Sequence, residues 1–418
     1  MNIQELNSWW ADKHVKKELA PETKRELFKE IEKDFNRKQI QILTGLRRTG
    51  KSTIMFQLIE KLINEKINPL NIIYTSFDET ELQEKKFDEI LKEYSKITNI
   101  DYKKEKIYWF IDEAQKSKNW ADNVKLIYDN FKNIKIFLSG SASLSILIES
   151  KKNLAGRAIY YELKPLSFKE FLKIRGIEVK DSEVNIHKDL LEKEFERFIS
   201  RQFPELINEN EISFIKNYIR SAVIEPVILK DIPKEFEEVD IILLEKLADI
   251  FLKNPGQYLQ IDGLAKDLKR TKKTIYTAIY YLEFSFLIRR VLNFRPSTRS
   301  TSRKLSRAYA YHPCICLPFG IPMEKYAENL VLFELDTKYY WRDKEKEIDF
   351  LKDNIPVEVK YASRIEKGDR KHIDYFMKKN SKKLNIDKAY VITKDFEGKE
   401  DKISFIPLWK FCFNGLNS

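Results

Sequence analysis

The stretch QIQILTGLRRTGKSTIMFQLIEKLI, residues 39–63, determines the fold expected at the amino-terminal end of the chain. It starts with an alternating segment rich in Ile and Leu, continues into a loop bounded by glycines, and ends in an amphipathic helical pattern. Strand, glycine-bounded loop and helix, in that order, predict a phosphate-binding loop. The alternative is a chance match in a loop that serves another purpose.

The loop has the residue types that a nucleoside triphosphate requires. Gly45 and Gly50 relieve steric constraint, so that consecutive backbone N–H groups can turn toward phosphate oxygens. The following helix adds its dipole, Lys51 can reach the outer phosphates, and Ser52 can ligate Mg²⁺. The residues predicted to bind ATP here are Gly45, Leu46, Arg47, Arg48, Thr49, Gly50, Lys51, Ser52 and Thr53.

A second apolar stretch, KIYWFIDEAQ at residues 106–115, runs directly into two acidic residues. A nucleotide hydrolase needs such a strand. Asp112 would hold Mg²⁺ through water, and Glu113 would orient or deprotonate the attacking water. Taken alone, the stretch also fits a surface turn after a core strand.

A third apolar stretch, NIKIFLSGSAS at residues 133–143, ends in small hydroxyl residues. Ser139 and Ser141 are candidates for sensing the outermost phosphate. Shortly afterwards Arg157 is predicted at the edge of the domain, where it would stabilise charge on the transferred phosphoryl group in its own subunit or in a neighbour's. Action between subunits would imply a homo-oligomer; an ordinary surface salt bridge is the alternative.

The motifs TGLRRTGKST (44–53), WFIDEAQ (109–115), FLSGSAS (137–143) and LAGR…YYELKPLSFKEF (154–171) together resemble a known family. It comprises prokaryotic, notably archaeal, AAA-type ATPases with a restriction-endonuclease-like domain at the carboxyl end. The resemblance covers most of the chain. It implies a P-loop fold of the additional-strand class, with Glu113 as the catalytic acid and base.

An α/β multidomain protein is therefore expected, and its length allows two to four domains. The expected segments are a P-loop ATPase domain with a parallel sheet flanked by helices at 1–160, a helical linker at 161–238, a winged helix at 239–312, and a restriction-endonuclease-like domain at 313–418.

The winged helix is predicted from a helix at 262–268, a second helix at 271–283 capped by Thr271, and a hairpin around 286–294. A second helix of this kind enters the DNA major groove and contacts it near its leading end. Winged helices also dock proteins, so that alternative stays open. The predicted DNA contacts are Lys269, Arg270, Lys272, Lys273, Tyr276, Arg295, Arg299 and Arg303.

Charge distribution supports a polyanionic partner. The net charge is +11, and residues 284–323 contain several arginines but no Asp or Glu. A stretch of one sign attracts nucleic acid, whereas the alternative is a solvated basic loop in a lysine-rich chain.

Near the carboxyl end, KEIDFLKDN and IPVEVK (346–360) predict two strands joined by a turn at Asp353 and Asn354. Pairing across this turn would place Asp349 beside Glu358, and such neighbouring acids repel unless a cation joins them. A divalent metal, Mg²⁺ or Mn²⁺, would relieve the repulsion and activate water against a phosphodiester. Lys360 would position that water or stabilise negative charge.

This pattern resembles the PD-(D/E)XK nuclease superfamily, in which an acid from the preceding helix often completes the metal site. Glu328 is the first candidate for that acid and Glu334 the second. Many such domains keep the fold for DNA binding or assembly without cutting, and that alternative stays open.

Other features are consistent with a cytoplasmic location. Cys314, Cys316 and Cys412 are too few for a disulfide framework, and HPCIC lacks a fourth ligand for zinc. No stretch is long and apolar enough to span a membrane, and the first residues lack a signal-peptide core. The sequence thus favours a Mg²⁺-dependent ATPase that engages DNA; the rival is a signalling or assembly ATPase with a silent nuclease-fold scaffold.

Overall fold

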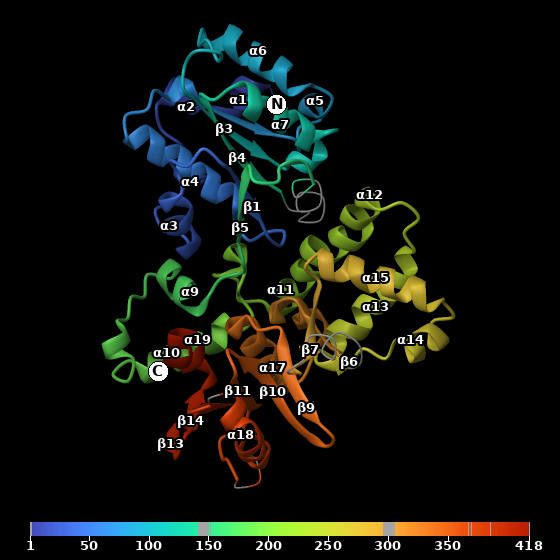
Figure 1. Cartoon of the computed structure of the whole chain (residues 1–418). Coiled ribbons are helices and arrows are strands. Elements are labelled where there is room, and N and C mark those ends of the chain that lie inside the picture. Colours follow the sequence, from blue (N-terminus) through green and yellow to red (C-terminus); the bar gives the residue numbers. More distant parts are fainter. Residues whose placement is uncertain are drawn as a thin grey trace. The chain divides into compact units, whose positions relative to one another are not determined.

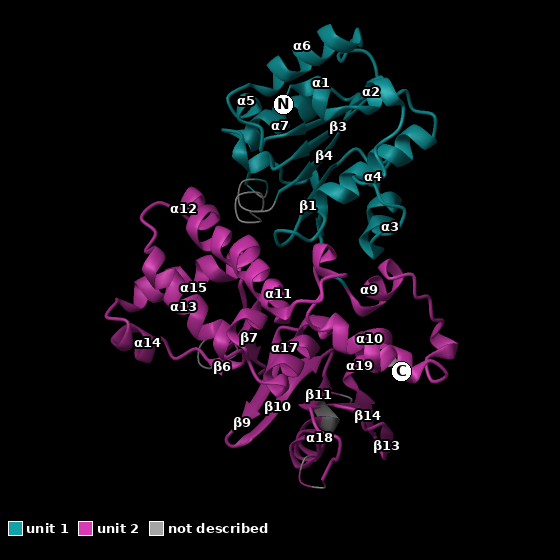
Figure 2. Cartoon of the chain, turned by 180° about the vertical axis from the view of Figure 1, so that it is seen from behind, with its two compact units in different colours: residues 1–166 teal, residues 167–418 magenta. Residues whose placement is uncertain are grey.

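The computed structural model describes residues 2–140, 150, 152–295, 306–366, 368, 370–384 and 386–417. Three predicted site residues, Ser141, Arg299 and Arg303, lie outside these ranges. The chain divides into two compact units, residues 1–166 and 167–418 (Figure 2). The segments expected from residue 161 onward therefore fall almost entirely within the second unit.

The first unit is built on five parallel strands in the order β2-β3-β4-β1-β5 (Figure 1). Their bounds are β1 Ile40–Thr44, β2 Ile72–Ser76, β3 Ile107–Asp112, β4 Ile134–Ser139 and β5 Ala158–Glu162. Strand β4 pairs with both β1 and β3, so it separates the strand that leads into the 45–50 loop from the strand that ends in Asp112. The expected parallel α/β fold of the P-loop ATPase type is confirmed.

Helices cover both faces of this sheet, which explains the nearly continuous apolar strands. The helices are α1 Ile3–Leu6, α2 Trp9–Asp12, α3 Glu26–Lys33, α4 Lys51–Asn64, α5 Thr80–Gln83, α6 Phe87–Thr98 and α7 Trp120–Asn130. Successive residues of β3 point to opposite faces: Phe110 packs in one core with residues of α3 and α4, and Ile111 packs in the other with residues of α6 and α7. The carboxyl ends of the strands are thereby held at one rigid edge.

The second unit begins with helices and continues into a three-helix element. The helices before this element are α9 Phe168–Ile174, α10 Lys188–Phe198, α11 Ile212–Tyr218 and α12 Ile232–Glu235. The element itself has α13 Ile241–Lys253, α14 Ile261–Asp267 and α15 Lys272–Phe284. Thr271 caps α15 as predicted, because its side-chain oxygen accepts a hydrogen bond from the backbone N–H of Thr274 at 3.1 Å.

A nine-stranded sheet follows in the order β13-β14-β12-β11-β10-β9-β7-β8-β6. Its strands are β6 Gln257–Tyr258, β7 Ile288–Asn293, β8 Ser306–Ala310, β9 Tyr339–Asp343, β10 Lys346–Lys352, β11 Ile355–Lys360, β12 Ala389–Thr393, β13 Gly398–Glu400 and β14 Ile403–Pro407. Strand β7 pairs antiparallel with β8 and parallel with β9, so the sheet crosses the boundary expected at residues 312–313. The remaining helices are α17 Met323–Leu335, α18 Lys371–Leu384 and α19 Leu408–Asn414.

The β10–β11 hairpin has the predicted register. Asp353 and Asn354 at its turn have φ of +49° and +67°, the left-handed pair found in tight hairpin turns. Phe350 pairs with Val357, which places the preceding Asp349 opposite Glu358. In the part of the chain that the structure describes, no helix has the length and apolar character needed to cross a membrane.

Candidate functional sites

The 45–50 loop requires glycine at both of its ends. Gly45 has φ +137°, and a Cβ there would lie 2.3 Å from the backbone oxygen of Leu163. Gly50 has φ +94° and is the N-cap of α4. These backbone conformations aim the loop and the start of α4 toward the carboxyl edge of the sheet, where phosphate oxygens can accept hydrogen bonds.

Lys51 lies over the loop that precedes it. Its buried Nζ donates to the backbone oxygens of Gly45 at 3.2 Å and Leu46 at 2.8 Å. Thr49 closes the loop from the other side, since its hydroxyl donates to the same Leu46 oxygen at 2.9 Å. The cation is therefore held beside the backbone groups that would meet a triphosphate.

Asp112, at the end of β3, gathers three hydroxyl groups. Ser52 donates to its Oδ2 at 2.5 Å, Tyr74 from β2 donates to the same oxygen at 2.9 Å, and Ser139 at the end of β4 donates to Oδ1. The structure thus brings the predicted Ser52, Asp112 and Ser139 together. A carboxylate beside a serine hydroxyl is the oxygen donor set that Mg²⁺ uses in P-loop sites.

Tyr74 was missed by the sequence reasoning. Burial, and next the charge of Asp112, raise the pKa of Tyr74, so its hydroxyl stays a donor at neutral pH. The only signal for it was its place near the end of an apolar strand, which is also where an ordinary core tyrosine would occur.

Glu113 sits just beyond the strand in a left-handed conformation, with φ +50°. Gln115 donates to its Oε2 at 2.7 Å, and the Glu113 backbone N–H donates to Asp112 Oδ1 at 3.0 Å. The carboxylate is therefore anchored one residue after Asp112, where an attacking water can be oriented.

Arg25 is a second residue that the sequence did not indicate. Its buried guanidinium donates to the backbone oxygens of Thr49 at 2.8 Å and of Lys164 at 2.7 Å. It thereby ties the 45–50 loop to the segment after β5. No local pattern marks a contact between residues so far apart along the chain.

The structure does not bring Arg157 to the 45–50 loop of its own subunit. Arg157 immediately precedes β5, and its backbone oxygen accepts from Ile40 at the start of β1. The 45–50 loop follows the other end of β1, roughly 16 Å away at ~3.3 Å per residue. The Arg157 guanidinium instead pairs with Asp129 at 2.9 and 3.2 Å, which matches the surface salt-bridge alternative.

The leading end of α15 in the second unit carries most of the described residues predicted to contact DNA. Arg270 donates to Asp240 at 2.8 Å, and Lys272 forms an ion pair with Asp262. Lys273 is exposed, as are Tyr276 (54%) and Tyr280 (45%), which follow at helical spacing on one face. The α15 face formed by Lys273, Tyr276 and Tyr280 is therefore available to a partner, whereas Arg270 and Lys272 are already paired with acids.

Two arginines of the acid-free stretch at residues 284–323 have acidic partners in the folded structure. Arg289 lies 3.2 Å from Asp336, and Arg290 lies 2.6 Å from Glu283. Both acids come from outside the stretch. The surface field of these two arginines is therefore weakened by their partners.

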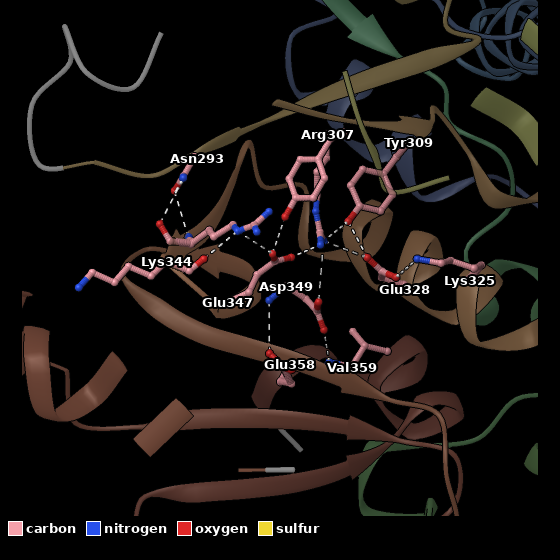
Figure 3. A network of polar contacts seen from close by, with 12 residues as sticks. Asn293, Arg307, Tyr309, Lys325, Glu328, Lys344, Glu347, Asp349, Glu358 and Val359 are labelled. Atoms are coloured by element: carbon pink, nitrogen blue, oxygen red, sulfur yellow. Dashed lines mark hydrogen bonds and ion pairs between the residues drawn. The ribbon is translucent and has the colours of Figure 1, made fainter. Parts of the chain in front are cut away.

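The predicted carboxyl-terminal site forms an acidic cluster, shown in Figure 3. Asp349 Oδ2 accepts from the backbone N–H of Val359 at 2.9 Å, and Lys360 lies 3.0 Å from Glu358. Burial, and next the charge of Glu358, raise the pKa of Asp349; burial also raises the pKa of Glu358, against the nearby charge of Lys360. The structure therefore brings the predicted Asp349, Glu358 and Lys360 together.

Arg307 on β8 also enters this cluster, which the sequence did not indicate. Its guanidinium lies 3.3 Å from Glu328 Oε1 and 3.9 Å from Asp349 Oδ1, and it contacts Glu347 (Figure 3). Burial by itself would lower the pKa of Arg307, but the neighbouring Tyr309 and the carboxylates raise this pKa above its ordinary value. Glu328 is thus the α17 carboxylate that joins the cluster.

Hydroxyl groups complete the cluster. Tyr309 donates to Glu328 Oε1 at 2.6 Å, and Tyr258 donates to Glu347 at 2.5 Å. Over the described ranges, no three or more His, Cys, Asp or Glu side chains are arranged to hold a metal ion. The predicted metal ligands Glu328, Asp349 and Glu358 do not fit a metal in this conformation, because a guanidinium lies between two of them.

The HPCIC segment is buried. His312 Nδ1 lies 2.8 Å from Cys314 Sγ, and burial raises the pKa of Cys314 and of Cys316. These residues belong to the core of the second unit.

Comparison with known proteins finds two family models that match parts of the chain. Residues 37–172 match a family model described as an AAA domain, and residues 193–316 match one described as a domain of unknown function (DUF8612). The first match contains the loop, Asp112 and Ser139. Together with the strand order, this match supports a P-loop ATPase-like fold for the first unit.

Relatives extend over more of the chain. Uncharacterized protein MJ1544 of Methanocaldococcus jannaschii is 29% identical over 89% of this chain and 88% of its own length. Uncharacterized protein MJ1637 of the same organism is 29% identical over 62% of this chain and 58% of its own length. The Walker-type ATPase PABY2304 of Pyrococcus abyssi aligns over 72% of this chain and 96% of its own, with 16% identity and a TM-score of 0.43, which is too low to establish a shared fold.

Proposed function

We propose that this protein is a Mg²⁺-dependent ATPase whose nucleotide state controls how its second unit engages DNA. The observation that carries the proposal is the cluster around Asp112. Ser52, Tyr74 and Ser139, from three different elements, all donate to one carboxylate beside the 45–50 loop. Such convergence at the carboxyl edge of a parallel sheet is what phosphoryl transfer requires.

The residues of the first unit divide the chemistry among them. The loop N–H groups and Lys51 would bind the β- and γ-phosphates, while Ser52 and Asp112 would hold Mg²⁺. The metal would neutralise charge developing on the transferred phosphoryl group. Glu113 would accept a proton from the attacking water, and Ser139 would relay the loss of the γ-phosphate to Asp112.

DNA engagement is proposed for α15. The order α13, α14, α15, then the antiparallel β7 and β8, supports a winged helix. The exposed Lys273 and Tyr276 lie near the start of α15, where such helices touch bases and backbone. The remaining second-unit strands, with Asp349, Glu358 and Lys360 on one hairpin, support a nuclease-like domain.

A second candidate function is a signalling or assembly ATPase with a silent nuclease-like scaffold. Two observations favour it: Arg270 and Lys272 already have acidic partners, and Arg307 lies in the acidic cluster. In that case α15 would dock a protein.

A binding series separates the two functions. Fluorescence anisotropy of labelled single-stranded, duplex and branched DNA is measured from about 50 to 200 mM salt, with ATP, with ADP and without nucleotide. Affinity that falls with salt and differs between ATP and ADP supports the DNA function. No binding to any DNA at the lowest salt would contradict it and leave the assembly function.

A further inference from the structure

A basic cavity lies at the amino edge of the first unit's sheet. Its volume is about 400 Å³, and the segments that lead into β1, β3 and β4 line it. These segments are far apart along the chain, but the three strands are parallel neighbours in the sheet, so their amino ends meet at one edge. The 45–50 loop follows the other end of β1, roughly 16 Å away. The cavity is therefore separate from the proposed nucleotide site.

The cavity carries more positive charge than nearby acids balance. Among the described residues that line it, none is acidic and six are basic: Arg37, Lys38, Lys104, Lys106, Lys132 and Lys135. Arg37 pairs with Asp34, and Lys104 lies 3.4 Å from Asp101. The other four have no acidic side chain in ion-pair contact within the described part of the chain. Four lysines therefore give the cavity an excess of positive charge.

Asp129 is a further acid in this region, but it does not neutralise the cavity. A hydrogen bond from Arg157 is the main cause that lowers the pKa of Asp129, and the charge of Lys38 adds only a smaller effect. The Arg157 guanidinium lies 2.9 Å from the Asp129 carboxylate. Asp129 is therefore already paired outside the cavity.

The lysines of the cavity are close enough to affect one another. Lys135 is buried, and its Nζ donates to the backbone oxygens of Arg37 at 2.5 Å and Gln39 at 2.6 Å. Burial is the main cause that lowers the pKa of Lys135, and the like charge of Lys106 lowers it further. An anion between such cations would relieve their repulsion.

Aromatic rings form the apolar walls of the cavity and hold two of the ammonium groups. Lys38 Nζ lies 4.5 Å from the ring centroid of Tyr128, and Lys106 Nζ lies 5.1 Å from that of Tyr108. Apolar walls beside charges of one sign concentrate the electric field in a cavity and attract counter-ions. The volume also lies in the range of roughly 300–1,000 Å³ that is usual for small-molecule pockets.

We infer that this cavity binds a ligand that carries two or more phosphate groups close together. Lysine ammonium groups bind phosphate as point charges, and several of them around one cavity match a ligand with more than one negative charge. A free polyphosphate has this chemistry. So does the 5′-phosphorylated end of a nucleic acid strand, where the terminal phosphate adjoins a phosphodiester. The inference depends neither on ATP hydrolysis nor on the second unit.

Isothermal titration calorimetry of the full-length protein with inorganic pyrophosphate tests the inference. The titration is done at low salt, where screening is weak, and with saturating ADP, so that the 45–50 loop does not contribute. The cavity variant, Lys38→Met combined with Lys106→Met, should bind pyrophosphate about tenfold or more weakly than the unaltered protein, because two cavity charges are removed. The control variant, Lys16→Met combined with Lys29→Met, removes two exposed lysines that do not line the cavity and should bind normally.

A second titration distinguishes the two sources of the phosphate groups. Fluorescence anisotropy is measured for a 3′-labelled single-stranded oligonucleotide with and without a 5′-phosphate. Tighter binding of the phosphorylated strand that is lost in the cavity variant and kept in the control variant assigns the cavity to a strand end. Equal binding of the two strands, together with pyrophosphate binding, assigns it to a free polyphosphate.

Equal pyrophosphate affinity in the cavity and control variants, both folded by circular dichroism, would overturn the inference. So would a lack of pyrophosphate binding by the unaltered protein. If the cavity variant does not fold, Lys104→Met combined with Lys132→Met takes its place with the same expected loss, and no loss would again overturn the inference. ATP hydrolysis should be the same in all these variants, so failure of the proposed function would show in that assay and not in the comparison of cavity and control variants.

Discussion

The hydroxyl of Tyr309 on β8 donates to the carboxylate of Glu328 on α17 at 2.6 Å. Both groups are largely buried, and the same carboxylate oxygen also faces Arg307 at 3.3 Å. The bond therefore joins the β7–β8 hairpin to the helix that precedes the β10–β11 hairpin. The same Glu328 carboxylate thus pairs with Arg307 and links β8 to α17.

Tyr309→Phe should lower the free energy of unfolding of the second unit by about 1–2 kcal/mol, because it removes one hydrogen bond to a buried charged group. Urea denaturation followed by circular dichroism measures the change. Tyr339→Phe is the control, since Tyr339 is 38% exposed, and it should stay within about 0.5 kcal/mol. Equal stability of the two variants would mean that the Tyr309–Glu328 bond is not formed in solution.

Glu113→Gln should retain ATP binding and reduce hydrolysis by about 10²–10⁴-fold, because the amide cannot accept the proton of the attacking water. Phosphate release gives the turnover rate, and fluorescence of an ATP analogue gives the affinity. Glu84→Gln alters an exposed acid of the same unit and should leave both quantities unchanged. Persistent hydrolysis in Glu113→Gln would assign the base to another residue.

Gly45→Ala should abolish ATP binding and cost at least about 2 kcal/mol of stability. The added Cβ would meet the Leu163 backbone oxygen at 2.3 Å, in addition to the strain of a positive φ. Gly156→Ala is the matched control: φ is +75°, but no atom lies within 4 Å of the added Cβ. It should cost about 1 kcal/mol and bind ATP normally; the same loss in both variants would show that strain alone explains Gly45.

The core of the first unit was predictable because its signals are local. Glycine positions, apolar runs and the acid or hydroxyl after each run specify where strands end, and parallel strands bring those ends to one edge. That is why Ser52, Asp112 and Ser139 could be expected to lie together, as they do in the structure. The position of Arg157 was harder to predict. The sequence shows that it adjoins a strand but does not show at which edge of the sheet that strand begins.

The site residues that the sequence did not indicate make contacts with distant parts of the chain. Arg25, Tyr74 and Arg307 act on partners far away along the chain, and nothing in their immediate neighbours distinguishes them from surface or core residues. The sheet that crosses residues 312–313 was hidden for a related reason. Pairing of β7 with β9 uses backbone hydrogen bonds, which leave no side-chain pattern to read.

Lys135 should make the stability of the first unit depend on pH. Burial lowers the pKa of Lys135 to about 8, below its ordinary 10.5. The charge of Asp34 acts in the opposite direction but is the smaller effect. Between these values the unfolded chain binds more protons than the folded one, so stability rises with pH across that window. The destabilisation is complete below pH 8 and is relieved as the pH approaches 10.5.

The measurement is the difference in unfolding free energy between the unaltered protein and Lys135→Met, from pH 7.5 to 10. It should shift in favour of the unaltered protein by about 1–3 kcal/mol as the pH rises. The lower figure allows for the Arg37 and Gln39 carbonyl oxygens that accept from Lys135. Lys132→Met, at an exposed lysine, should show no such slope, and a flat difference for Lys135→Met would contradict the shift.

Lys273→Ala should weaken DNA binding and reduce the slope of log affinity against log salt by about one, since one phosphate contact is lost. Tyr276→Ala should weaken binding with the salt slope unchanged, because its ring contributes stacking rather than charge. Anisotropy titrations of both variants over the salt series separate the two effects. Lys246→Ala removes an exposed lysine of α13 and is the control; if it lowers affinity as much as Lys273→Ala, binding follows overall charge and α15 is not the contact.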